Sequence, residues 1–401
     1  MKKFYLLLLL ALPYACTDPT EETSTPSPYH IGEWLLTFDI DATHIPIHAN
    51  FTADSLLQIH NGLETITAPI LFRNDSLYIE LPHYQTYLSA SITTHDHITG
   101  HWHNTQKGAD YLVPFEAKPN YQESHFDEDK LEKFQVEFSP NTDDSYPALA
   151  LFTLHEHATG TFLTETGDYR FLAGHFIDNQ LQLSCFDGSH LFHFEAELNG
   201  DSLINGTFFS GTHWQEDWQG VKNDNYELRH PDSLTSVLDN SKPLELNIMS
   251  LSGEFVQLDS SYFQDKVTII QILGTWCPNC LDETKYYQEL YNAYSDQGLQ
   301  IVPIAFERSQ DFETSSITVE RYFTDLGIDY PAYIGGQANK LNATKAFPML
   351  TPIISYPTSI YVDKTGKICK VHTGFYGPST GAYYNRYTES TSQFIQQKLS
   401  E

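Results

Sequence analysis

The chain has 401 residues and a formal net charge of −30 at pH 7, because 52 acidic residues outnumber 22 lysines and arginines. Its length exceeds that of one typical domain. The acidic balance argues against nucleic acid and against an anionic membrane surface as partners, since both require clustered Lys and Arg. The 25 tyrosines and 25 phenylalanines favour a portion rich in β-strands.

The first residues, MKKFYLLLLLALPYAC, place two lysines before a short apolar run. This pattern predicts a secretion signal over residues 1–15. The run is shorter than the about 20 residues of a transmembrane helix, so cleavage is expected. Ala15 before Cys16 resembles a bacterial lipoprotein cleavage site, which would make Cys16 the lipid anchor. Simple cleavage near Ala15 is the alternative.

Residues 16–30 are rich in Ser, Thr, Pro and acid, which predicts a tether. The acids Asp18, Glu21 and Glu22 resemble the export signal of Bacteroidetes surface lipoproteins. The expected location is the cell envelope, anchored by lipid and facing the periplasm. Outer-membrane or surface exposure stays open.

Residues 31–228 contain short alternating segments such as WLLTFDI, LYIEL and LINGTFF, separated by turn residues. This pattern predicts a β-rich domain, either an antiparallel barrel or a sandwich. Two stretches align, with Leu77 opposite Leu181 and Gly100 opposite Gly206, which predicts an internal duplication.

The segment over residues 229–243, RHPDSLTSVLDNSKP, is predicted to be a linker. Residues 244–401 then alternate strand-like and helix-like patterns and include a hairpin at DKTGK, which indicates a mixed α/β sheet. The apolar run VTIIQIL reads as its central strand, and a helix ending at Gly298 follows.

Cys277 and Cys280 lie two residues apart in GTWCPNCLDET, directly after that central strand. A structural zinc site usually needs four ligands, and this domain contains one histidine, His372, and no second CxxC pair. A disulfide that closes so small a loop contributes little to stability. Redox exchange is the remaining role, and no metal is expected.

The neighbours of the pair also fit redox chemistry. Cys277 stands where a strand ends and a helix begins, and the free N–H groups and dipole of that helix favour a thiolate. Cys277 is therefore predicted to attack, and Cys280, one turn further on, to resolve the mixed disulfide. Pro278 suits the first helical turn, and Trp276 would shield the sulfurs.

Residues 244–401 resemble a thioredoxin-fold domain of the TlpA/ResA type, the thiol-disulfide oxidoreductases of the cell envelope. WCPNC matches the WCxxC of the family, YVDKTGKI matches its strand-turn-strand, and GEFVQLDSSYFQDKVTIIQ matches its entry into the central strand. The resemblance implies an α/β thioredoxin fold, exchange with protein thiols and disulfides, a membrane electron donor and no cofactor. The β-rich half resembles N-terminal regions of Bacteroidetes proteins of this group.

The same resemblance implies a substrate-binding loop. Tyr356, Pro357 and Thr358 match the cis-proline loop, which in this fold faces the disulfide and pairs with the substrate backbone. Trp276 and Pro278 complete the set of residues predicted to contact substrate.

One departure from thioredoxin itself concerns proton transfer. Thioredoxin buries an aspartate on the central strand, where this chain has Gln271, and an amide cannot accept a proton from Cys280. ResA-like proteins carry a glutamate three residues after the second cysteine, and Glu283 holds that position. Burial would raise its pKa into a useful range. An acid favoured by the helix dipole is the alternative, and Glu307 after the next strand is a further candidate.

Two other groups of residues were weighed. His95, His97, His101 and His103 fall within HDHITGHWH, where a metal site competes with a solvated strand face. Cys185 and Cys369 lie on predicted strands and are expected to be buried, although an oxidising compartment would permit a bridge.

The sequence therefore predicts an envelope thiol-disulfide oxidoreductase, most readily a reductase as in its TlpA/ResA relatives, serving cytochrome c maturation or thiol maintenance. A peroxidase of the peroxiredoxin class is the first alternative, disfavoured by Gly274 where the PxxxTxxC motif has threonine. A binding module in which the β-rich half dominates is the second.

Overall fold

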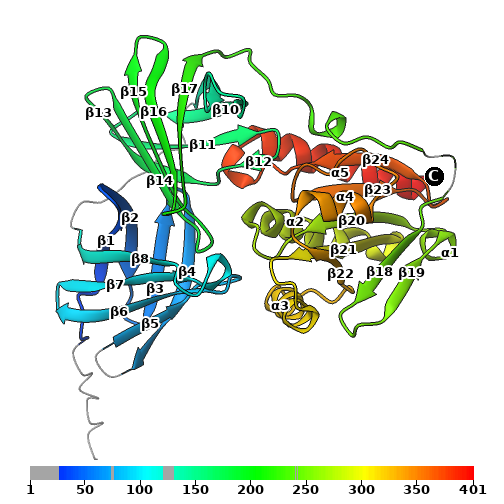
Figure 1. Cartoon of the computed structure of the whole chain (residues 1–401), viewed down its shortest axis with the longest axis horizontal. Helices are drawn as coiled ribbons and strands as arrows, with labels where there is room; N and C mark the ends of the chain where they lie inside the picture. Colours follow the sequence, from blue (N-terminus) through cyan, green and yellow to red (C-terminus); the bar gives the residue numbers. More distant parts are fainter. Residues whose placement is uncertain (1–26, 74–75, 121–130, 240, 242) are drawn as a thin grey trace, which may run out of the picture.

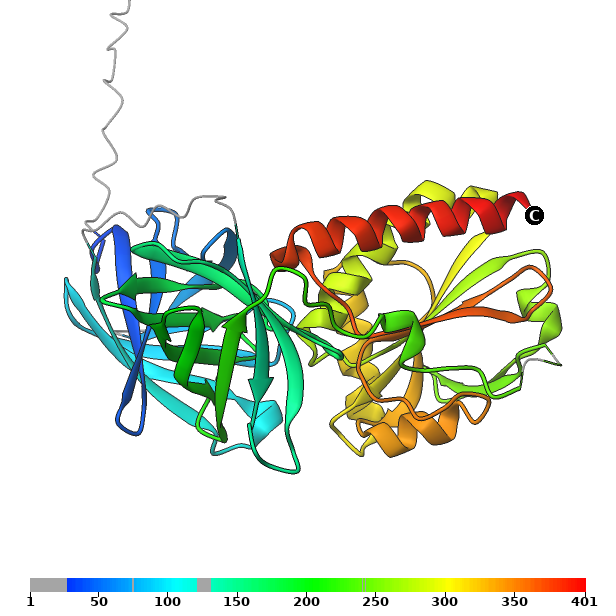
Figure 2. The same ribbon diagram turned by 90° about the horizontal axis from the view of Figure 1, so that it is seen from above.

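The computed structural model describes residues 27–73, 76–120, 131–239, 241 and 243–401. Two β-barrels form one half of the molecule and an α/β domain forms the other (Figure 1). Helix α5 (Ala382–Ser400) runs along the α/β domain with its N-terminal end toward the barrels (Figure 2). Within the described ranges, no helix is both long and apolar enough to cross a membrane. The predicted signal and Cys16 lie outside these ranges.

The first barrel is a closed set of eight antiparallel strands. Its strands are β1 (Gly32–Ile40), β2 (Thr43–Phe51), β3 (Leu56–Asn61), β4 (Glu64–Arg73), β5 (Ser76–Glu80), β6 (Thr86–Thr94), β7 (His97–Asn104) and β8 (Leu112–Pro119). In β1, Trp34, Leu36 and Phe38 are buried while the residues between them are more exposed. This two-residue alternation points one row of side chains into the barrel.

The second barrel repeats this architecture and is closed by pairing of β10 with β11. Its strands are β9 (Glu132–Phe138), β10 (Tyr146–Thr153), β11 (His157–Thr164), β12 (Gly167–Asp168), β13 (Leu172–Ile177), β14 (Gln180–Phe186), β15 (Leu191–Asn199), β16 (Ser202–Ser210) and β17 (Trp214–Lys222). Packed aromatic rings fill its interior, among them Phe138, Phe162 and Trp218. The prediction of an antiparallel β-rich domain is confirmed, and of the two alternatives the structure adopts the barrel.

The two barrels also agree with the predicted duplication. Leu77 and Leu181 lie on β5 and β14, and Gly100 and Gly206 lie on β7 and β16. A Cβ atom on Gly100 would lie 2.3 Å from a backbone oxygen of β6, and one on Gly206 would lie 2.4 Å from a backbone oxygen of β17. Both aligned glycines are therefore required by the close approach of a neighbouring strand.

The α/β domain contains a seven-stranded sheet in the order β19-β18-β22-β21-β20-β23-β24, in which β20, β21 and β22 are parallel. Its elements are β18 (Leu246–Ser250), β19 (Phe255–Leu258), α1 (Ser260–Phe263), β20 (Val267–Leu273), α2 (Pro278–Tyr294), β21 (Leu299–Glu307), α3 (Phe312–Asp325), β22 (Tyr333–Gln337), α4 (Lys340–Ala346), β23 (Thr358–Val362), β24 (Ile368–Thr373) and α5. Every residue of β20 is buried, as expected for a central strand covered on both faces. Gly298, with φ 101°, follows α2 after a short 3₁₀ turn.

Three elements of this domain were not predicted. Strand β22 has the sequence YIGGQ, whose two glycines weaken the strand pattern, and it pairs along β21 with a register shift. Helices α1 and α4 have only four and seven residues. Elements this short depend on tertiary packing rather than on periodicity.

The connection between β14 and β15 joins the two barrels. We call residues Phe186–Leu191 the β14–β15 tip. Phe186 and Leu191 pack into the core of the first barrel. Asn61 of β3 donates to Phe186 O at 3.2 Å and accepts from its N–H at 3.0 Å, and Thr86 of β6 donates to Gly188 O at 2.6 Å. The tip of the second barrel thus closes one end of the first.

Candidate functional site

Cys277 caps the N-terminus of α2. The buried strand β20 ends at Leu273, and the chain turns into the helix with Cys277 in an extended conformation and Pro278 as the first helical residue. The Cys277 Sγ accepts the N–H of Cys280 at 3.4 Å. A sulfur at this position meets free backbone N–H groups and the positive end of the helix dipole, and both stabilise a thiolate.

Cys280 lies one turn into α2 and is fully buried. Burial raises the pKa of its thiol well above the ordinary value, and the neighbouring Cys277 raises it further. Both cysteines are free thiols in this structure. The two sulfurs are therefore unequal: Cys277 caps the start of a helix, and the fully buried Cys280 needs help to lose its proton.

Glu283 is the acid next to this buried thiol. It is fully buried, and desolvation raises its pKa to about 7. Three donors hold the carboxylate and moderate that rise: Gln271 Nε2 at 2.9 Å, Ser359 Oγ at 3.0 Å and Tyr287 Oη at 3.0 Å. The negative charge of Glu283 also contributes to the raised pKa of Cys280. The structure thus brings the predicted proton acceptor to the predicted resolving thiol.

Gln271 has a structural role in place of the acid that thioredoxin carries there. Its amide donates to Glu283 and, at 3.4 Å, to Cys280 O, while its oxygen accepts from Thr284 Oγ1 at 3.1 Å. Gln271 therefore links β20 to the turn of α2 that carries Cys280 and Glu283, and it cannot itself take a proton.

The loop before β23 faces the cysteines. Cys277 Sγ lies 3.5 Å from Tyr356 O, and the bond between Tyr356 and Pro357 is cis. The Tyr356 ring packs edge-on against Trp276 with centroids 5.6 Å apart, and both rings stay half-buried. Thr358 is fully buried, and its hydroxyl donates to the backbone of Ser355. The substrate contacts predicted for this loop and for Trp276 and Pro278 stay predictions.

Glu307, the other acid considered from the sequence, binds the loop between β20 and α2. Its carboxylate accepts the N–H of Thr275 at 3.0 Å and the Thr275 hydroxyl at 2.8 Å. Burial raises its pKa to about 7. These bonds fix the loop that carries Trp276, whose indole N–H donates to Phe306 O at 3.0 Å.

The barrels cover the cysteines, which the sequence did not predict. Ser189 of the β14–β15 tip donates to Trp276 O at 3.0 Å. Asn279, between the two cysteines, donates to Asp168 O of β12 at 3.2 Å, and Ser355 donates to Thr166 O at 2.6 Å. With these contacts in place, Cys277 is only 8% exposed.

Arg170 contacts all three parts of the chain, which are the first barrel, the second barrel and the α/β domain. Its buried guanidinium donates to Glu64 of the first barrel and to Asp282 of α2, and it lies 3.8 Å from Asp187 of the β14–β15 tip. Burial lowers the pKa of Arg170, but these carboxylates raise it well above the ordinary value. A cation shared in this way ties the barrels to the helix that carries the redox pair.

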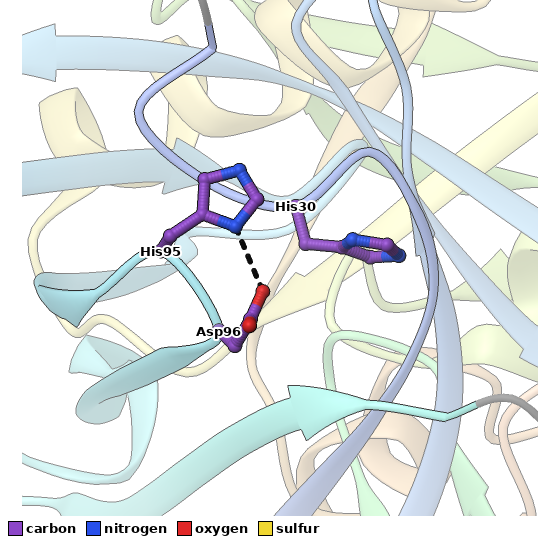
Figure 3. A group of neighbouring side chains, drawn as sticks. All are labelled: His30, His95 and Asp96. Atoms are coloured by element: carbon purple, nitrogen blue, oxygen red, sulfur yellow. Dashed lines mark hydrogen bonds and ion pairs between the residues drawn. The ribbon is translucent and has the colours of Figure 1, made fainter.

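The histidines considered as metal ligands do not gather into one site. His97 contacts Glu116, whereas His103 stacks on Tyr87. Only His95 takes part in a group of metal-ligand type, with His30 and Asp96. Figure 3 shows the bond between the His95 ring and Asp96, which is 2.8 Å long. One ligand atom from each of the three residues lies within 4.8 Å of the other two.

The two other cysteines among the described residues, Cys185 and Cys369, are also free thiols. Cys185 is fully buried in the second barrel, as predicted, and burial raises its pKa well above the ordinary value. Cys369 is only partly buried, and its pKa rises to about 11. The expectation of burial is therefore met only in part for Cys369, which lies on β24, the edge strand of its sheet.

Comparison with known proteins finds a family match for the part of the chain that contains the two cysteines. Residues 239–383 match the Redoxin family. The C-terminal part of the chain is a Redoxin domain with a thioredoxin-like fold. The fold predicted for residues 244–401 is thereby confirmed.

Curated relatives of the Redoxin domain include thiol-disulfide oxidoreductases named ResA. One from Halalkalibacterium halodurans is 29% identical over 124 residues, which are 31% of this chain and 62% of the relative. One from Geobacillus thermodenitrificans is 30% identical over 112 residues, which are 28% of this chain and 57% of the relative. The chain thus spans about three fifths of the length of these relatives.

Similar solved structures carry related names. A thiol:disulfide interchange protein of the thioredoxin family from Chlorobium tepidum is 20% identical, with a TM-score of 0.30, and the match covers 40% of this chain and 99% of that one. The thioredoxin domain of a thiol-disulfide oxidoreductase from Bacteroides vulgatus is 21% identical, with a TM-score of 0.28 and coverage of 40% and 99%.

Proposed function

We propose that the chain is a thiol-disulfide oxidoreductase that exchanges disulfides with other proteins through Cys277 and Cys280. The observation that carries this proposal is the position of Cys277 Sγ, which caps α2 on the N–H of Cys280 and lies beside the loop at Tyr356. A helix N-terminus stabilises the attacking thiolate, and a buried thiol one turn further on is placed to displace whatever Cys277 binds.

In the reducing direction, the Cys277 thiolate attacks one sulfur of a partner disulfide. The partner S–S bond breaks, a mixed disulfide forms on Cys277, and one partner thiolate leaves and takes a proton from solvent. Cys280 then gives its proton to Glu283 and attacks the Cys277 sulfur. The second partner thiolate leaves and receives a proton in turn, so two electrons pass to the partner and a Cys277–Cys280 disulfide remains.

The finer parts of this proposal come from the sequence. A signal over residues 1–15 and lipid on Cys16 would anchor the protein in the cell envelope, facing the periplasm. A membrane electron donor would restore the dithiol after each cycle. Reduction, for cytochrome c maturation or thiol maintenance, is the proposed direction because the ResA-like resemblance implies it.

The trapping of mixed disulfides tests the order of the thiols. Cys280→Ser should accumulate mixed disulfides with partner proteins, because attack survives and release is lost. Cys277→Ser is the matched control and should trap few. Non-reducing gels of cells expressing each variant give the measurement. Equal trapping by both variants, or trapping by Cys277→Ser alone, would contradict the assignment of attacker and resolver.

A further inference from the structure

A pocket lies where the second barrel meets the Redoxin domain, beside the covered redox pair. Its volume is about 410 Å³, and it is lined by residues of the second barrel, by Lys107 of the first barrel and by Arg308 of the Redoxin domain. We call it the junction pocket. Aromatic rings line it together with six polar or charged residues, namely Lys107, His190, Ser210, His213, Glu216 and Arg308. The rings belong to Tyr146, Tyr169, Phe192, Phe208 and Trp214.

Positive charge dominates this pocket, although the whole chain is strongly acidic. Lys107 and Arg308 each lower the pKa of His213, which burial and these cations together bring to about 4. Burial and Arg308 likewise lower the pKa of Lys107 to about 8. The pocket thus holds two permanent or nearly permanent cations that repel each other and keep the imidazole of His213 neutral.

The carboxylate of Glu216 lines the pocket and that of Asp187 lies near it, and both already accept hydrogen bonds from this chain. Glu216 accepts from Ser139 at 2.6 Å, from Tyr146 at 2.8 Å and from Trp214 at 3.1 Å. The charge of Asp187 raises the pKa of Lys107. The same carboxylate also accepts hydrogen bonds from His190 and lies 3.8 Å from the Arg170 guanidinium. Among the described residues, the Lys107 ammonium finds no hydrogen-bond acceptor and rests near the faces of Trp102 and Tyr111.

Arg308 connects the pocket to the redox pair. Its guanidinium lies 4.9 Å from the centre of the Trp276 ring, directly before Cys277. Burial lowers the pKa of Arg308, and the nearby Cys277 raises it. On the other side, His190 belongs to the β14–β15 tip, whose Ser189 holds Trp276 O. A chain bound in the junction pocket would therefore run beside the Trp276 side of Cys277.

We propose that the junction pocket binds an acidic segment of the partner protein, next to the disulfide that Cys277 attacks. This inference rests on the proposed function and adds the chemistry by which the partner is chosen. Lys107 and Arg308 attract the acidic side chains, and the five rings form an apolar wall for their stems. Complementary charge of this kind mainly increases the rate of productive encounter.

The test compares two synthetic peptides that share one intramolecular disulfide and differ only in flanking glutamates or flanking glutamines. The full chain is assayed for kcat/KM with each peptide, and the ratio of the two values is the readout. This ratio cancels any general loss of activity or of folded protein. We expect the wild type to prefer the glutamate peptide, and the preference to shrink at high salt.

Lys107→Gln and Arg308→Gln should each lower the ratio roughly two- to five-fold, as for the loss of one positive charge that acts on the glutamates through a screened field. Lys118→Gln is the matched control, since Lys118 is an exposed lysine that pairs with Glu116 on β8, and its ratio should equal that of the wild type. Equal kcat/KM for both peptides in the wild type would overturn the inference and leave the proposed function intact.

Two further outcomes separate the alternatives. Benzoate carries a charge and a ring but no chain, and if it competes with the glutamate peptide at concentrations below that peptide's KM, the pocket belongs to a small anion and the inference fails. If neither peptide is turned over, the proposed function fails and the inference fails with it.

Discussion

At the scale of single residues, Glu283 is a carboxyl group with a pKa of about 7 next to a thiol that must lose a proton. Only its carboxylate form can accept that proton. The fraction in this form rises with pH through about 7, so the resolving step should accelerate over the same range.

We expect Glu283→Gln to slow the resolving step and to remove this rise with pH. The loss should be several-fold near neutral pH, because general-base help is worth about 10²–10⁴ at most and solvent replaces part of it. Stopped-flow Trp fluorescence can follow the step, with Trp276 beside the sulfur as reporter. Glu289→Gln, an exposed acid on the same helix, is the control. An unchanged rate and profile would make Glu283 an ordinary acid of the first turns.

Tyr287→Phe tests how the pKa of Glu283 is set. The Tyr287 hydroxyl donates to the Glu283 carboxylate and lowers its pKa, so its removal should move the midpoint of the pH profile above about 7. Tyr286→Phe is the matched control, because that hydroxyl donates to Thr388 O instead. A midpoint that stays in place, or moves down, would contradict this account.

Sequence patterns predicted the redox role of the cysteine pair from local chemistry, and the resemblance to TlpA/ResA proteins implied Glu283 and the loop at Tyr356. They did not predict Arg170, Asp168 or Ser189. These residues act through partners about 90 to 110 positions away, as in the contacts of Ser189 with Trp276 and of Arg170 with Asp282. A single polar residue in a strand or a loop gives no periodic pattern from which such a distant partner could be predicted.

At the scale of elements, we expect the ion pairs of Arg170 to hold the barrels against α2. Its removal leaves Glu64, Asp282 and Asp187 close together without their shared cation. Breaking a buried ion pair in this way typically costs about 3–5 kcal/mol.

Arg170→Met should therefore lower the urea midpoint of unfolding markedly, and it should speed the alkylation of Cys277 by iodoacetamide because α2 is held less firmly. Arg229→Met is the control, since Arg229 is 69% exposed where it pairs with Glu165, and little change is expected there. Unchanged stability together with unchanged alkylation would show that the barrels hold α2 by other contacts.

The same scale shows the limit of pattern reasoning for the β-rich half. Alternating burial such as that of β1 is common to sandwiches and barrels, so the pattern alone left both open. The decision lies in the pairing of β1 with β8 and of β10 with β11, which closes each sheet on itself. Closure is a long-range property that no single strand records.

At the scale of the whole molecule, the prediction to test is that lipid on Cys16 anchors the protein to a membrane. Cys16→Ser should release the protein into the soluble fraction without changing its fold, because the lipid is expected on that residue alone. Membrane fractionation and blotting give the measurement, and circular dichroism checks the fold. A variant that stays with the membrane would show that the lipid prediction is wrong.

The β14–β15 tip also has a consequence for the order in which the chain acquires its structure. Chains tend to fold domain by domain from the N-terminus as they emerge. Residues 31–222 supply both barrels, and they precede Cys277 in the chain. If the exported chain folds in this order, the surface that receives Trp276, Asn279 and Asp282 forms before the segment with Cys277 folds. Cys277 would then be covered by the folded barrels soon after its own segment folds. This leaves little time for non-native disulfides with other unfolded chains.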